Sequence, residues 1–189
     1  MSSRTATAAQ SLTAITEEVG ACAQQVAGAD LSRLAQLLDR YERVFVLGAG
    51  RSGLALRMTA MRLMHLGLTV HVVGEVTTPA IGPQDILLTA SGSGSTAAVV
   101  RAAETAVAAG AEVAAITTNP RSRLAELAGT VVVVPAAEKL DRSGAASSQY
   151  AGSLFEQTVM LIGDALFHAL WLNSGASGDD LWPRHANLE

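Results

Sequence analysis

The sequence predicts an α/β fold, in which a five-stranded parallel sheet is flanked by helices in a single doubly wound domain. Short apolar runs, each about the length of one strand, alternate along the chain with longer segments of helical periodicity. Two glycine-rich loops follow the first and third apolar runs. The expected strands are residues 44–47, 69–73, 85–89, 112–117 and 130–134.

Helices are expected between and around these strands. Since Asn caps helices and Pro is tolerated in a first turn, Asn119 and Pro120 are expected to begin a short one. Gly175 is expected to end the last long helix. The longer predicted helices cover residues 5–27, 30–38, 52–66, 95–109 and 150–172. We expect the flavodoxin-like strand order 2-1-3-4-5, in which the loops after the first and third strands border one crevice.

Length and composition fit one domain spanning residues 1–189, with N-terminal helices (1–42), a sheet core (43–135) and a long C-terminal helix and tail (150–189). The single cysteine, Cys22, and the lack of an apolar segment at the N-terminus favour the cytoplasm. No apolar run reaches the ~18 residues of a membrane helix, so no membrane partner is expected. A net charge of −4 argues against nucleic-acid binding.

The loop at residues 91–96 (SGSGST) predicts a phosphate site. Glycine lets the backbone approach a ligand closely, and the start of the following helix offers unpaired N–H groups. Hydroxyl groups add further donors, so a small phosphorylated ligand can be held without lysine. An ordinary strand-to-helix turn is the alternative. The candidate binding residues are Ser91, Ser93, Ser95 and Thr96.

The loop at residues 48–53 (GAGRSG) fits the dinucleotide pattern G-x-G-x-x-G, and Glu75 after the next strand could contact a ribose. Against a dinucleotide, the chain has no room for a separate substrate domain, and the serine loop would stay unexplained. Arg51 more naturally meets an oxygen or anion of a substrate. Gly50, Arg51 and Ser52 are therefore candidate substrate-binding residues.

Several segments resemble the 6-phospho-3-hexuloisomerase family of SIS-domain proteins, in the same order from residue 48 to residue 189. The most specific are residues 61–67 (MRLMHLG) and the terminal residues 184–189 (RHANLE). The others are residues 48–53, 72–75 (VVGE) and 91–94. In place of the family's Pro-Leu-Gly-Thr-like stretch, this chain has residues 150–153 (YAGS), which leaves the shape of that loop open.

The resemblance implies interconversion of D-arabino-3-hexulose 6-phosphate and D-fructose 6-phosphate through an enediolate, in the ribulose monophosphate route of formaldehyde fixation. It also implies a homo-oligomer, usually a tetramer, with sites shared between subunits. No cofactor and no metal are expected for this chemistry. Other sugar-phosphate isomerases and non-catalytic sugar-phosphate sensors built on SIS domains remain the alternative functions.

Glu156 and His185 are the candidate catalytic residues. Glu156 lies near the start of the last long helix among apolar residues, which suits a general base, although acidic residues favour a first helical turn for the dipole alone. His185, in a short tail, could reach a neighbouring subunit and assist ring opening of fructose 6-phosphate. His65, within the family-specific block, is a candidate for substrate binding, with packing as the equal alternative.

Overall fold

The computed structural model describes residues 6–137 and 147–188. Its sheet has five parallel strands in the order β2-β1-β3-β4-β5, which confirms the predicted fold class and strand order. Residues 1–5, 138–146 and 189 lie outside the described residues, and they include position 5, the predicted start of the first helix. The strands are β1 (Arg43–Gly48), β2 (Thr69–Val72), β3 (Asp85–Ala90), β4 (Glu112–Thr117) and β5 (Thr130–Val133).

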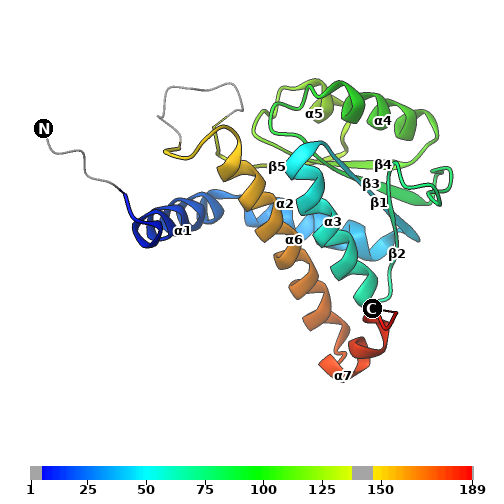
Figure 1. Cartoon of the computed structure of the whole chain (residues 1–189). Coiled ribbons are helices and arrows are strands. Elements are labelled where there is room, and N and C mark those ends of the chain that lie inside the picture. The colour runs from blue at the N-terminus through cyan, green and yellow to red at the C-terminus, as the bar shows by residue number, and fades with distance from the viewer. Residues whose placement is uncertain (1–5, 138–146, 189) are drawn as a thin grey trace, which may run out of the picture.

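Helices cover both faces of the sheet (Figure 1). One face carries α2 (Gly28–Arg40), α3 (Gly50–His65) and α6 (Ser153–Ser174), and α1 (Ala8–Gln25) packs against α6. The other face carries α4 (Ala97–Ala108) and α5 (Arg123–Leu127). In the described part of the chain, no helix is long and apolar enough to cross a bilayer.

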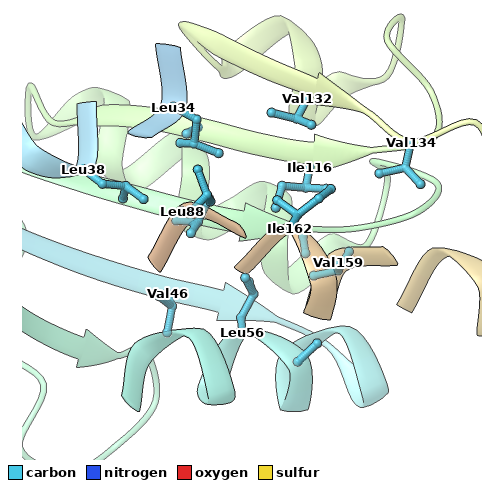
Figure 2. Packing of buried hydrophobic residues seen from close by; sticks show 14 of the residues in the cluster. Leu34, Leu38, Val46, Leu56, Leu88, Ile116, Val132, Val134, Val159 and Ile162 are labelled. Atoms are coloured by element: carbon cyan, nitrogen blue, oxygen red, sulfur yellow. The ribbon is translucent and has the colours of Figure 1, made fainter. Parts of the chain in front are cut away.

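Alternating side chains of the strands build two separate cores, because successive residues of a strand point to opposite faces. Val46, Leu88 and Ile116 belong to the larger core, and Phe45 and Leu87 belong to the smaller. Figure 2 shows the larger core, where residues of α2, α3 and α6 lie over the sheet: Leu34, Leu38, Leu56, Val159 and Ile162. Strands buried on both faces explain the near-continuous apolar runs of the sequence.

Helices α3 and α6 pack against each other along much of their length. Gly163 of α6 lies against Thr59 of α3, and both residues are buried. A Cβ atom at position 163 would lie 3.0 Å from the Cβ of Thr59, so the missing side chain permits this approach. Both helices begin at the same edge of the sheet, which brings their first turns together.

The short helix α5 begins later than predicted. Ser122, not Asn119, is its N-cap, and the Ser122 side chain accepts a hydrogen bond from the N–H of Ala125. Asn119 instead accepts a hydrogen bond from the N–H of Arg121, which closes a turn before the helix. The prediction failed because both residues form local side-chain hydrogen bonds, and turns and caps use the same ones.

The long helix ends as predicted at Gly175, which has a left-handed conformation with φ of 68°. The tail then forms α7 (Gly178–Leu181) and one turn of 3-10 helix, η1 (Trp182–Arg184). The guanidinium of Arg184 donates a hydrogen bond to the carbonyl of His65, which joins this tail to the far end of α3.

Candidate active site

A pocket of about 510 Å³ opens at the carboxyl ends of β1 and β3, where the strand order reverses. This is the position predicted from the two glycine-rich loops. The pocket also takes in the start of α6. Its lining residues include Gly50, Arg51, Ser52, Ser91, Ser93, Thr96, Ser153 and Glu156.

Three helices begin at this pocket without a capping side chain. The N-cap residues of α3, α4 and α6 are Ala49, Thr96 and Gly152, and none of them accepts a side-chain hydrogen bond from its helix. Of the helices that begin elsewhere, α1 and α5 are capped by Thr7 and Ser122, whereas α2 has no capping side chain. Unpaired N–H groups and the positive ends of three helix dipoles therefore face one cavity, an arrangement that favours an anionic ligand.

The serine loop between β3 and α4 is held by hydrogen bonds at both of its ends. The hydroxyls of Ser91 and Thr96 lie 2.9 Å apart. The carbonyl of Gly92 accepts hydrogen bonds from the side chains of Thr117 and Thr118. Gly94 has a positive φ of 60° and lies directly against the side chain of Ser122, where a Cβ atom would clash. The loop is thus a preformed cradle.

Arg51 and Glu156 form an ion pair across the pocket. The Nε of Arg51, in the first turn of α3, lies 3.0 Å from the carboxylate of Glu156, in the first turn of α6. The Glu156 side chain is 19% exposed, so the pocket reaches it while most of it is covered. Arg51 also lies 3.5 Å from the hydroxyl of Ser153, which itself donates to the carbonyl of Tyr150.

The structure brings together most of the predicted binding residues, but not all of them. Ser95 is exposed, bonds to Ser93 and does not line the pocket. His65 ends α3, whose 16 residues begin at the pocket. At 1.5 Å per residue, His65 is roughly 22 Å from the pocket of its own chain. The prediction of His65 as a binding residue therefore holds only for a pocket of another subunit.

His185 lies beside His65, not beside Glu156. The two imidazole rings are stacked with their centroids 4.0 Å apart, and Trp182 lies 4.8 Å from His185. His65 is buried, and its Nδ1 has no hydrogen-bond partner. Burial, followed by electrostatic repulsion from His185 and Arg62, lowers the pKa of His65 below its usual value.

Sequence reasoning missed the loop before α6. Tyr150, Gly152 and Ser153 line the pocket, although only Glu156 of this region was a candidate. The helix was predicted to begin at residue 150, whereas α6 begins at Ser153. That predicted start, six residues before the candidate base, was the signal for them, since residues at one end of a helix lie together. Glu75, the possible ribose ligand, pairs with Arg57 at 2.6 Å and lies outside the pocket lining.

The described residues, 6–137 and 147–188, contain no evident metal-binding site. No group of three or more His, Cys, Asp or Glu side chains there is arranged to hold an ion. Among the described lining residues, the polar groups are hydroxyls, backbone N–H groups, one guanidinium and one carboxylate. This set suits a polyol that carries one anionic group.

Comparisons with known proteins agree with this geometry. Residues 37–163 match the SIS domain. A protein of Mycobacterium gastri named 3-hexulose-6-phosphate isomerase is 54% identical over 178 residues, covering 94% of this chain and 89% of the relative. A Bacillus subtilis protein of the same name is 36% identical over 176 residues, covering 93% and 95%.

A solved structure from Methanococcus jannaschii has the same fold with a TM-score of 0.80 and 26% identity, covering 95% of this chain and 99% of the other. It is described as a hypothetical protein whose structure infers a molecular function of 3-hexulose-6-phosphate isomerase. The SIS match covers more than half of the chain, and the two relatives span nearly all of it. The chain belongs to the 3-hexulose-6-phosphate isomerase family of SIS-domain proteins.

Proposed function

We propose that this protein is an isomerase that interconverts D-arabino-3-hexulose 6-phosphate and D-fructose 6-phosphate, a step of the ribulose monophosphate route. The observation that carries the proposal is the convergence of three uncapped helix starts on a pocket that holds a carboxylate. The names of the relatives from Mycobacterium gastri and Bacillus subtilis support the choice of sugar.

The reaction moves a carbonyl group between adjacent carbons. A base removes the proton from C2 of the 3-ketose, and the electrons of that bond form the C2–C3 double bond of an enediolate. The oxygen on C3 gains a proton, the oxygen on C2 loses one, and C3 is protonated to give the 2-ketose. No electrons leave the substrate, so the chemistry itself requires no redox cofactor.

Glu156 is the proposed base, because it is the acidic residue among the described residues of the pocket lining and its side chain is mostly covered. The Arg51 guanidinium beside it holds the carboxylate in place and offers N–H donors to the developing enediolate oxygens. Ser91, Ser93 and the backbone at the start of α4 bind the phosphate. Binding at the remote phosphate then holds C2 and C3 near the base.

His185 is proposed to act in the pocket of a neighbouring subunit, within the homo-oligomer that the family resemblance implies. An exposed apolar stripe supports this: Leu54, Met58 and Met61 lie along one face of α3 with 62%, 46% and 51% of their surface exposed. Antiparallel pairing of two such stripes would bring the His65 end of one α3 to the Gly50 end of the other. A tetramer and a cytoplasmic location are proposed with it.

Turnover tests the reaction directly. We would generate 3-hexulose 6-phosphate in place from formaldehyde and ribulose 5-phosphate with a hexulose phosphate synthase, and follow the formation of fructose 6-phosphate. Glu156→Gln is expected to lower kcat by about 10²–10⁴-fold, the usual range for a general base. Asp164→Asn is the matched control, because this exposed acid of the same helix should leave activity unchanged. If the protein shows no turnover but fructose 6-phosphate still raises its Tm, the result would indicate an isomerase for another sugar phosphate or a non-catalytic sensor.

Mixing inactive subunits tests the shared site. Glu156→Gln and His185→Ala proteins are each assayed from fructose 6-phosphate, the direction that needs ring opening, and are then mixed and reassembled. In a mixed pair, one site receives both native residues. Activity should therefore recover to about a quarter of wild type with random pairing. No recovery in verified mixed oligomers would contradict the sharing of sites.

A further inference from the structure

Glu18, in the middle of α1, accepts hydrogen bonds from residues 147–149. These residues come just before residues 150–153, which line the pocket. One oxygen of the Glu18 carboxylate accepts a hydrogen bond from the backbone N–H of Ser148 at 2.6 Å. The other accepts from the hydroxyl of Ser147 at 2.8 Å and from the side-chain amide of Gln149 at 2.9 Å. Residues 147–149 are thus held by a carboxylate about 130 positions earlier in the sequence.

The segment held in this way leads directly into a strained residue. Ala151 has a φ of 52° and is the one non-glycine residue with a positive φ in the described part of the chain. Such a conformation costs about 1–3 kcal/mol and persists only where the surroundings impose it. On the other side of Ala151, the N–H and hydroxyl of Ser153 both donate to the carbonyl of Tyr150.

Ser153 connects this segment to the ion pair of Arg51 and Glu156. The Ser153 hydroxyl lies 3.5 Å from the guanidinium of Arg51, which pairs with Glu156 at 3.0 Å. Tyr150, Ala151, Gly152 and Ser153 all line the pocket. A change at Glu18 therefore reaches the pocket wall through a short series of contacts, although Glu18 does not line that pocket.

The hydrogen-bond donors around Glu18 favour the ionised form of its carboxylate. Burial alone would disfavour the ionised carboxylate, but the hydrogen bonds from Ser148, Gln149 and Ser147 outweigh burial and lower the pKa of Glu18 to about 2. At neutral pH the side chain is an ionised acceptor facing donors, the arrangement that gives the strongest hydrogen bonds.

We propose that Glu18 is a positioning residue for the pocket: its carboxylate fixes residues 147–149, so that Ala151 keeps its left-handed conformation and α6 presents Ser153 and Glu156 correctly. The inference rests on the proposed function for its kinetic consequence, but not for its structural one. Helix α1 thereby contributes to the geometry of the site, although Glu18 does not line the pocket.

The kinetic test compares Glu18→Ala with Glu17→Ala, an exposed neighbour on the same helix. Glu18→Ala is expected to lower kcat/KM by about 10–100-fold, since small misplacements of reacting groups cost that much. Glu18→Gln should fall between them, because its carbonyl oxygen can still accept from the N–H of Ser148. Equal activity of the Glu18→Ala and Glu17→Ala proteins would overturn the proposal.

A second substitution separates positioning from general destabilisation. Glycine adopts a positive φ without strain. Ala151→Gly therefore removes the conformational strain at position 151, which the hydrogen bonds of Glu18 help to maintain in the wild-type protein. Adding Ala151→Gly to Glu18→Ala should recover about three-fold or more of the lost kcat/KM, a coupling that independent sites lack. A loss that Ala151→Gly leaves unchanged would refute the role.

Amide hydrogen exchange tests the same idea without any turnover. In Glu18→Ala, exchange at residues 148–156 should accelerate by about ten-fold or more relative to Glu17→Ala, while the sheet keeps its protection. If the wild-type protein fails to isomerise the sugar, the proposed function falls and this measurement still decides the role of Glu18. Unchanged exchange at residues 148–156 would overturn the positioning role whatever the activity.

Discussion

Gly163→Ala tests the close packing of α3 against α6, on which the geometry of the site depends. The new Cβ atom would lie 3.0 Å from the Cβ and 3.2 Å from the Cγ2 of Thr59, and closer still to its hydroxyl. Carbon atoms normally approach to about 3.5–4.0 Å, so one helix must shift by several tenths of an ångström. Thr59 cannot yield easily, because it is 2% exposed and its hydroxyl bonds to the Ala55 carbonyl.

The magnitude follows from two costs and one gain. Overpacking of a close-packed core costs about 1–3 kcal/mol, and turning Thr59 away would lose a hydrogen bond worth about 1 kcal/mol. Alanine in place of glycine within a helix returns about 1 kcal/mol. We therefore expect the free energy of unfolding to fall by about 2 kcal/mol, which lowers the Tm by about 4–8 °C in a chain of this size.

The assay is thermal unfolding at one fixed protein concentration, because oligomer dissociation makes the Tm depend on concentration. Gly20→Ala is the control: its Cβ atom meets nothing within 4 Å, so it should raise stability by about 0.5–1 kcal/mol. Adding Thr59→Ala to Gly163→Ala removes the clash and should restore about 1–2 kcal/mol. A Gly163→Ala protein as stable as wild type, or indifferent to Thr59→Ala, would refute the reasoning.

Three further predictions concern the phosphate loop, a partly buried ion pair and acid stability. Gly94→Ala combines a positive φ with a clash against Ser122, so the dissociation constant of fructose 6-phosphate should rise about ten-fold or more by calorimetry; an unchanged constant would contradict the preformed cradle. Asp85→Asn leaves Arg43 without its paired carboxylate, whose two oxygens each lie 2.7 Å from guanidinium nitrogens, and should cost about 2 kcal/mol in denaturant unfolding; a loss below about 0.5 kcal/mol would oppose this. Because the pKa of His65 in the folded protein lies below its usual 6.5, its contribution to stability is complete above about pH 6.5 and is lost as the pH falls through that lowered value. The Tm of the wild-type protein should therefore fall more between pH 7 and pH 5 than that of His65→Gln, and equal slopes would contradict this.

Much of the fold could be predicted from the sequence because its signals are local. Apolar runs of strand length, separated by helical segments, already imply a parallel sheet covered on both faces. The strand order then brings the loops after β1 and β3 together, which predicted the pocket beside Arg51 and Ser91. Glu156 could be found in the same way, as an acid in the first turn of an apolar helix.

Only the tertiary structure decided the contacts between segments that are distant in sequence. Periodicity shows which face of α1 or α3 is buried, but not which side chain meets it. The bond from Glu18 to Ser148, the pair of Arg51 with Glu156, and the stacking of His65 on His185 all depend on helix packing and loop conformation. The physical reason is that each such contact is set by the three-dimensional path of the whole chain, whereas sequence patterns report only the neighbours of a residue along it.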